Sequence, residues 1–180
     1  MKEFKPLLEI GNIPAAERII QTFRDAGIAD IVVVTGNNAA RLESSLNHLS
    51  LIFLLNREYK QTEMFDSVKI ALEYMKDKYQ RILFTPVDIP LFTTETVMML
   101  VKNDAQVTIP VFNKKRGHPI ALDGSVTAQI LNYSGSGGLR EAIENLSLEV
   151  DYIDVNDPGI LYDMDTSDDY TKIVKMYNAN

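Results

Sequence analysis

The 180-residue sequence contains no cysteine, which excludes a disulfide framework and any zinc site built on thiolates. Long apolar runs are also absent, because stretches such as residues 31–34 and 51–55 are far too short to cross a bilayer. The first residues, 1–6, contain no apolar core of the kind found in a secretory signal. These absences favour a cytoplasmic protein with no membrane partner.

An excess of positive charge is missing as well. Aspartate and glutamate outnumber lysine and arginine, 25 to 18, so the formal net charge is −7. The basic triplet Lys114-Lys115-Arg116 is too small to track a nucleic-acid backbone, so a nucleic-acid partner is disfavoured. A small phosphorylated ligand held through a metal ion is compatible with this charge, because a divalent cation reconciles an acidic protein with an acidic substrate.

Apolar residues recur alternately at helical spacing and in short β-rich runs. The predicted strands are residues 31–34, 51–55, 81–85, 106–111, 119–122 and 150–155. The predicted helices cover residues 13–23, 39–46, 65–75, 97–101, 125–131, 139–146 and 170–177. Continuous apolar strands between amphipathic helices indicate a mostly parallel sheet with helices on both faces. Since no repeat or linker-like segment divides the pattern, we expect one α/β domain over residues 1–180.

Two of the predicted helices have specific start signals. Thr93 or Thr94 precedes the apolar stretch at 97–101 and can cap that helix. Thr166 and Asp169 have the spacing of a capping box, with aspartate in place of the usual glutamate or glutamine.

Asp88 follows the predicted strand 81–85 and comes shortly before Pro90. In open parallel sheets, ligands bind beyond the carboxyl ends of the strands. An aspartate at this position is suited to bind a metal ion, whereas a loop aspartate can equally cap a neighbouring backbone amide. Position alone leaves both interpretations open.

A second acidic cluster spans residues 163–169. Alternate residues of an extended segment face the same way, so Asp163 and Asp165 are able to converge on one cation. Asp168 and Asp169 fall in the first turn of the predicted last helix, where the helix dipole favours acids. A structural role therefore explains Asp168 and Asp169 better than a catalytic role, while both interpretations stay open for Asp165.

Three other features are individually weak. Lys5 precedes an apolar segment and on its own has the character of a surface lysine. His118 lies in a Gly-His-Pro turn without a local metal partner, and the loop 134–138 has the composition of a phosphate-binding loop but neither of the established glycine patterns. No Ser/His/acid or Cys/His triad can be assembled, so covalent nucleophilic catalysis has no support.

Taken together, short segments in a fixed order make the chain similar to the MobA-like nucleotidyltransferases, closest to the molybdenum-cofactor cytidylyltransferase (MocA-like) branch. Each segment is short, but their ordered combination is specific and covers nearly the whole chain. The matching segments are residues 4–8, 30–36, 64–69, 87–91, 116–119, 137–140 and 163–166.

The resemblance implies a Rossmann-like fold of the GT-A type and an Mg²⁺-dependent reaction. In that reaction, CMP or GMP passes from CTP or GTP to a molybdopterin-like phosphorylated acceptor, and pyrophosphate is released. Transfer to a sugar phosphate or another alcohol phosphate is an alternative within the same class. A non-catalytic domain that binds a nucleotide or a partner protein is the alternative from another class. The oligomeric state is left open.

The resemblance also implies roles for individual residues. Lys5 and Asp88 would be the catalytic and nucleotide-binding residues, with Lys5 on the nucleotide phosphates and Asp88 on Mg²⁺. Asp163 or Asp165 would supply a further metal ligand. The acceptor side would be formed by two short segments, made up of Gly117, His118 and Pro119 and of Gly137, Gly138 and Leu139.

One departure from the family pattern affects the start of the chain. The family begins with a strand and a loop of the type A-A-G-x-S-x-R-M directly before the segment that matches residues 4–8, and Met1 aligns with the last residue of that loop. We therefore expect the first strand and the loop to be missing from this sequence. Truncation, a degenerate binding module or a substituting element would each explain this, and the intact remaining motifs favour truncation.

Overall fold

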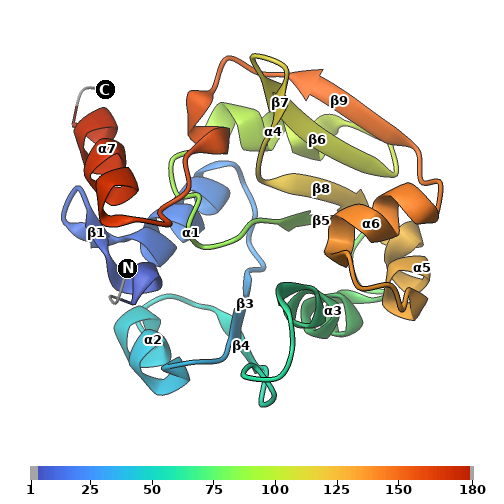
Figure 1. Ribbon diagram of the computed structural model, residues 1–180, viewed down its shortest axis with the longest axis horizontal. Helices are drawn as coiled ribbons and strands as arrows, with labels where there is room; N and C mark the ends of the chain where they lie inside the picture. The colour runs from blue at the N-terminus through green and yellow to red at the C-terminus, as the bar shows by residue number, and fades with distance from the viewer. Residues whose placement is uncertain (1–3, 179–180) are drawn as a thin grey trace.

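The computed structural model describes residues 4–178, in which the strands form three sheets (Figure 1). Strands β1 (Glu9–Ile10) and β2 (Ile13–Pro14) pair antiparallel, and β3 (Val32–Thr35) and β4 (Ile52–Leu55) pair parallel. The largest sheet has five strands, in the order β5 (Arg81–Phe84), β8 (Ile120–Asp123), β6 (Val107–Phe112) and β7 (Lys115–Arg116), with β9 (Val150–Asp154) parallel to β6. Met1, which we expect to align with the last residue of the family's first loop, lies outside the described residues.

Helices surround these sheets and match the predicted helices closely. They are α1 (Ala15–Asp25), α2 (Ala39–Leu46), α3 (Met64–Met75), α4 (Thr94–Lys102), α5 (Thr127–Asn132), α6 (Gly138–Asn145) and α7 (Ser167–Tyr177), with 3-10 turns η1 (Lys5–Leu7), η2 (Gly124–Val126) and η3 (Pro158–Leu161). The expected caps are confirmed. The Thr93 hydroxyl accepts a hydrogen bond from the Thr96 amide, and Thr166 and Asp169 form a capping box.

The sheet is mixed, which corrects the expectation of a mostly parallel sheet. Asn113 and Lys114 both adopt left-handed backbone angles, with φ of 49° and 64°, and this two-residue turn sends β7 back antiparallel to β6. The chain then continues into β8, which lies antiparallel between β5 and β6. A short reversal instead of a helical crossover is therefore what makes this part of the sheet antiparallel.

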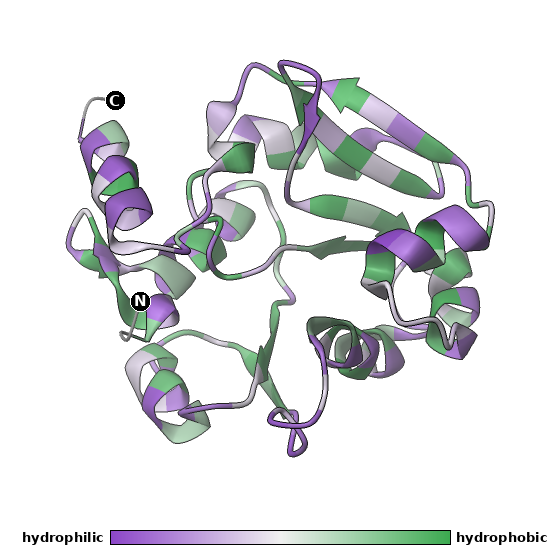
Figure 2. Ribbon diagram, viewed as in Figure 1, coloured by the Kyte–Doolittle hydropathy of each residue, from purple (hydrophilic) through white to green (hydrophobic). Residues whose placement is uncertain are grey.

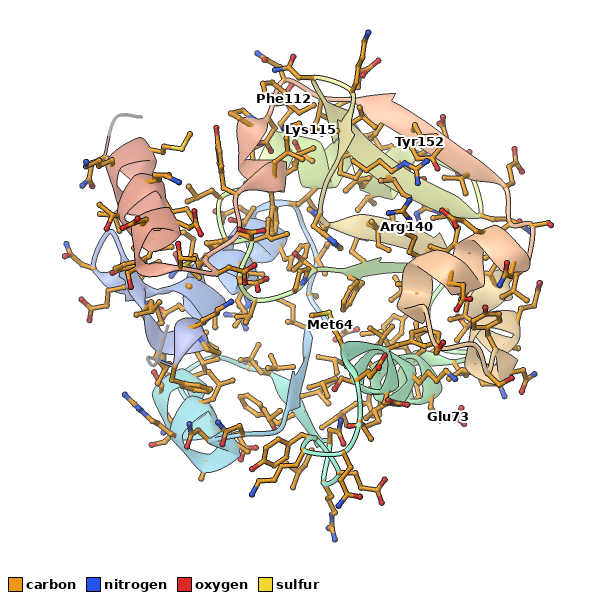
Figure 3. All side chains as sticks on the ribbon, viewed as in Figure 1. Met64, Glu73, Phe112, Lys115, Arg140 and Tyr152 are labelled. Carbon is orange, nitrogen blue, oxygen red and sulfur yellow. The ribbon has the colours of Figure 1, made fainter. Side chains whose placement is uncertain are left out.

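A hollow of about 530 Å³ separates the β3–β4 pair from β5. Within residues 4–178, the edge of β3 that faces away from β4 and the edge of β5 that faces away from β8 pair with no other strand. Apolar side chains line the hollow, among them Ile20, Val33, Val68 and Leu83, and Met64 at the start of α3 lines it too (Figure 3). Two unpaired strand edges therefore border this apolar space within the described residues.

The core consists of three clusters of buried apolar side chains. One lies between the five-stranded sheet and helices α3, α5 and α6; a second joins α1, α2 and α4 to the segment after β9; and a small third cluster includes Ile10 and Ile173, which join β1 to α7. Apolar residues accordingly follow the inner strands and the inward helix faces (Figure 2). Residues 4–178 contain no helix that is long and apolar enough to span a bilayer.

The first helix begins later than its apolar spacing predicts. Ile13 belongs to β2, and Pro14 is the N-cap residue of α1. Proline has no backbone N–H, so it is tolerated at a helix start and disfavoured inside a helix. The short β1–β2 hairpin and η1 therefore occupy the residues ahead of α1 and carry Lys5 to the edge of the site.

Candidate functional site

Lys5 and two of the predicted acids form one cluster. The Lys5 ammonium nitrogen lies 2.7 Å from a carboxylate oxygen of Asp165 and 3.4 Å from one of Asp88. The Lys5 and Asp88 side chains are largely buried, with 28% and 22% exposed, whereas Asp165 is 65% exposed. Residues from the start, middle and end of the chain thus meet at one point.

The backbone fixes this meeting point. Lys5 begins the short turn η1 and is followed by Pro6, which fixes the backbone there, and Asp88 lies in the loop that follows the carboxyl end of β5. The backbone N–H of Met164 donates a hydrogen bond of 3.0 Å to the carbonyl oxygen of Asp88. This bond ties the loop of Asp88 to the segment that carries Asp163 and Asp165.

The charges of the cluster shift the pKa of Lys5. Burial alone would lower the pKa of the ammonium group, but the hydrogen bond to Asp165 and the charges of Asp88 and Asp165 outweigh it, so the pKa of Lys5 is raised. Lys5 is therefore a fixed positive charge at neutral pH. The position suits a cation that faces anionic groups, and it does not suit a proton carrier.

Asp163 lies beside the cluster in a different environment. Burial raises the pKa of Asp163, and the negative charges of Asp165 and Asp88 raise it further. Residues 4–178 contain no group of three acidic, histidine or cysteine side chains arranged to hold a metal ion. The structure therefore brings Asp88 and Asp165 together through Lys5, and it does not complete a three-carboxylate site with Asp163.

The predicted Gly-His-Pro segment adjoins this cluster. The His118 ring packs against the Phe84 ring with centroids 6.0 Å apart, and the His118 backbone N–H donates to the Ile160 carbonyl at 3.0 Å. Gly117 has no room for a side chain, because a Cβ there would lie 2.5 Å from the Ile160 carbonyl oxygen. Burial lowers the pKa of His118, although a backbone hydrogen bond at Phe84 and the charge of Asp88 oppose this, so the imidazole is neutral at pH 7.

The other predicted acceptor segment lies elsewhere. Gly137 precedes α6, Gly138 and Leu139 begin it, and α6 lies on the opposite side of the molecule from α7 and η1 (Figure 1). Arg140 on α6 and Tyr152 on β9 are both on that side (Figure 3). The structure thus places His118 close enough to Asp88 to feel its charge and keeps Gly137–Leu139 apart from this cluster.

Sequence reasoning missed one residue that supports the site. Asp157 is only 4% exposed, and its carboxylate accepts hydrogen bonds from Thr93, Thr96 and Gly159. Its signal in the sequence is the Asp-Pro-Gly order of residues 157–159, which is typical of an exposed turn. What distinguishes Asp157 is that residues far away in the sequence bury it, and no local sequence pattern predicts this.

Comparison with known proteins assigns the chain to a family. The sequence profile described as MobA-like NTP transferase domain matches residues 1–150. The chain belongs to the MobA-like NTP transferase domain family. It is therefore a nucleotidyltransferase by family, as the ordered motifs predicted, while a single domain over residues 1–180 stays a prediction.

Curated relatives of this MobA-like chain include bifunctional GlmU proteins. The protein from Staphylococcus epidermidis is 29% identical over 102 residues, which cover 57% of this chain and 22% of the relative. The protein from Pseudoalteromonas atlantica is 30% identical over 146 residues, which cover 78% of this chain and 32% of the relative. The chain thus spans about a fifth to a third of the length of these relatives.

Solved structures confirm the Rossmann-like nucleotidyltransferase fold. Rv0371c from Mycobacterium tuberculosis H37Rv superposes with a TM-score of 0.84 at 17% identity, covering 97% of this chain and 90% of that chain. The nucleotidyl transferase Mth528 from Methanothermobacter thermautotroptrophicus gives a TM-score of 0.84 at 18% identity, covering 98% and 86%. CMP:2-keto-3-deoxy-manno-octonic acid synthetase in complex with CTP gives 0.77 at 14% identity, covering 97% and 92%. At these identities the likeness establishes the fold.

Proposed function

We propose that the protein transfers CMP or GMP from CTP or GTP to a molybdopterin-like phosphorylated acceptor and releases pyrophosphate. The observation that carries this proposal is the cluster of Lys5, Asp88 and Asp165 beyond the carboxyl end of β5, in a chain of the MobA-like family. Ligands of open α/β sheets bind at such strand ends. The structure of molybdopterin-guanine dinucleotide biosynthesis protein A from Archaeoglobus fulgidus, with a TM-score of 0.68, has the same fold.

The donor set of the cluster fits Mg²⁺, the cofactor that the family implies. Mg²⁺ prefers oxygen ligands and is commonly held by one or two carboxylates together with substrate phosphates. Asp88 and Asp165 already stabilise one cation between them, the Lys5 ammonium group. These two carboxylates would hold Mg²⁺, and Asp163 is a further candidate ligand beside them. The complex of Rv0371c with manganese is in keeping with a divalent ion in this fold.

The proposed reaction needs little chemistry from the protein itself. A phosphate oxygen of the acceptor attacks the α-phosphorus of the NTP, the bond from this phosphorus to the β-phosphate oxygen breaks, and pyrophosphate leaves. Since a phosphate monoester is largely ionised at pH 7, no general base is required. When bound, Mg²⁺ neutralises charge on the triphosphate. Lys5 adds a fixed positive charge, so orientation and charge neutralisation account for the catalysis.

The two glycine-containing segments are assigned to the acceptor. Gly117, His118 and Pro119 adjoin Asp88, and the neutral imidazole of His118 is able to hydrogen-bond an acceptor group without adding charge. Gly137, Gly138 and Leu139 lie apart, at the start of α6, so they would contact only an extended acceptor. An acceptor that reaches only the cluster would engage the first segment alone.

The decisive experiment is an assay of pyrophosphate release with CTP or GTP, Mg²⁺ and molybdopterin. We expect release in the presence of the acceptor and its loss in Asp88→Ala. Lys172→Ala is the matched control, because Lys172 forms an exposed pair with Asp169 at 3.2 Å and does not touch the cluster. If the chain, extended upstream with the A-A-G-x-S-x-R loop, releases no pyrophosphate with any acceptor, the proposal is wrong.

Transfer to a sugar-type acceptor is the second candidate. The fold match to CMP:2-keto-3-deoxy-manno-octonic acid synthetase, at a TM-score of 0.77, favours testing it. Parallel assays with sugar phosphates, other alcohol phosphates and molybdopterin separate the candidates, because only the true acceptor supports turnover at low concentration. Tight binding of NTP without turnover in all of these assays would instead indicate a binding module.

A further inference from the structure

Asp157 has an unusual environment for a carboxylate. It is buried, and one oxygen accepts hydrogen bonds from the Thr93 backbone N–H at 2.7 Å, the Thr93 hydroxyl at 2.9 Å and the Thr96 hydroxyl at 2.7 Å. The other oxygen accepts from the Gly159 backbone N–H at 2.9 Å. Among residues 4–178 it forms no ion pair with a lysine, arginine or histidine. Hydrogen bonds alone therefore offset the cost of burying this group.

The partners of Asp157 belong to two segments that carry the acids of the site. Thr93 ends the loop that contains Asp88, and Gly159 lies in η3, shortly before Asp163 and Asp165. The same two segments approach closely at a second point, where the Leu91 carbonyl oxygen leaves no room for a Cβ at Gly159. They are joined at a third point by the hydrogen bond from the Met164 amide to the Asp88 carbonyl.

A role as an ordinary helix cap does not account for this arrangement. Helix α4 already has its own cap, since the Thr93 hydroxyl accepts from the Thr96 amide. Asp157 instead binds the amide and hydroxyl of the capping residue and reaches the first turn through Thr96. Its other oxygen holds the segment that it comes from. The carboxylate therefore joins two loops. Because Asp157 is far from Lys5 and Asp88 in the sequence, the sequence alone does not reveal this link.

We propose that Asp157 is a positioning residue that sets the separation of Asp88 and Asp165. It acts through the backbone of the two loops and does not touch the substrate. Its effect on metal binding rests on the proposed function, whereas its effect on the loops does not. Residues that orient metal ligands without touching the metal typically change metal affinity about 10- to 100-fold when they are replaced.

The test uses Asp157→Asn, which keeps the size of the side chain but replaces one acceptor oxygen by a donor. Thr108→Val is the matched control: Thr108 is fully buried, and its hydroxyl bonds to Asn103, the C-cap of α4, at the far end of that helix from Thr93. Thr96→Ser is the conservative variant, because it keeps the hydroxyl that donates to Asp157. Each of these two variants is compared with Asp157→Asn at denaturant concentrations chosen so that the global free energy of unfolding is the same.

Hydrogen exchange of backbone amides is the first measurement. We expect the Met164 and Gly159 amides to exchange about tenfold faster or more in Asp157→Asn, and at the wild-type rate in Thr108→Val and Thr96→Ser. Equal exchange of the Met164 amide in Asp157→Asn and Thr108→Val would overturn the proposal. This measurement needs neither metal nor substrate, so it holds even if the proposed function fails.

Binding of Mn²⁺, followed by electron paramagnetic resonance without nucleotide, is the second measurement. We expect Asp157→Asn to bind Mn²⁺ at least about tenfold more weakly than wild type and Thr108→Val to bind it equally well. Unchanged Mn²⁺ affinity in Asp157→Asn would overturn the positioning of the acids. If the wild type itself binds no Mn²⁺, the proposed metal site fails, and the exchange of the Met164 amide alone decides the role of Asp157.

Discussion

The Lys5 ammonium group lies 2.7 Å from the Asp165 carboxylate, and 160 positions separate the two residues in the sequence. The same nitrogen lies 3.4 Å from Asp88, so one cation attracts both carboxylates and offsets part of their mutual repulsion. The proposed reaction brings a triphosphate to this point and adds more negative charge. The charge of Lys5 therefore affects how the site binds both the anionic triphosphate and a divalent cation.

Replacing Lys5 by methionine tests this role. The side chain keeps most of its length but loses its charge, so we expect turnover to fall by about 100-fold, as when one charge-stabilising group is removed from an active site. Stability should change by less than ~1 kcal/mol, because the ion pairs are partly exposed. Pyrophosphate release and urea unfolding are the measurements. Lys5→Arg, which keeps the charge, should retain more activity than Lys5→Met; equal activities of the two variants would contradict the role.

Local elements of the fold were predictable because their signals are local. The helix at 39–46 and the strand at 81–84 follow from apolar spacing, and the cap of α4 follows from Thr93. The two-residue strands β1, β2 and β7 were missed, because a strand of that length is too short to show alternation. The mixed sheet was missed because apolar periodicity does not show which strands pair or in which direction, and the antiparallel position of β8 between β5 and β6 depends on such pairing.

The candidate site was only partly predictable. Asp88 and Asp165 lie in motifs whose order indicates the family, so their approach could be expected. Asp157 could not be found, because its partners Thr93 and Thr96 lie more than 60 positions away and its own neighbourhood has the composition of a turn. Contacts between distant segments depend on how the loops pack, and the sequence pattern of one loop does not contain that information.

The hollow between β3 and β5 leads us to predict that an added strand stabilises the protein. We expect an apolar strand and an A-A-G-x-S-x-R loop, added ahead of Met1, to pair with both unpaired edges and raise the melting temperature by about 5 °C or more. The physical reason is the gain of strand hydrogen bonds and of buried apolar surface. Thermal unfolding followed by circular dichroism measures the change. An extension of equal length made of glycine and serine is the control, and equal melting temperatures for both extensions would refute the prediction.

Gly159→Ala tests the close approach of η3 to the loop of Asp88. The added Cβ would meet the Leu91 carbonyl and lie 2.9 Å from an oxygen of Asp157, so the backbone must shift. We expect the free energy of unfolding to fall by about 2 kcal/mol and Mn²⁺ binding to weaken. Gly27→Ala is the control, because Gly27 has a φ of +87° in open space and should lose stability through its backbone alone, without any change in Mn²⁺ binding. Unaltered Mn²⁺ binding in Gly159→Ala would show that η3 does not position the acids.

His118 predicts how stability depends on pH. The imidazole of the unfolded chain titrates near 6.5, and burial lowers the pKa of His118 in the folded protein. Between these two pKa values the unfolded chain binds more protons, so the contribution of His118 to stability is present above pH 6.5 and is lost as the pH falls through the folded pKa. His118→Gln should remove this dependence.

Urea unfolding at pH 7.5 and pH 5.0 measures the effect as a difference between two free energies of unfolding. We expect that difference to be smaller in His118→Gln than in wild type. His48→Gln is the matched control, because the His48 side chain is 52% exposed and, among residues 4–178, pairs only with Glu17. Asp123 and Asp169 also have lowered pKa values, but as carboxylates they lose their contributions below about pH 4, outside this range. If His118→Gln and wild type lost equal stability between the two pH values, a group other than His118 would cause the loss, and the buried neutral imidazole beside Asp88 would need to be reconsidered.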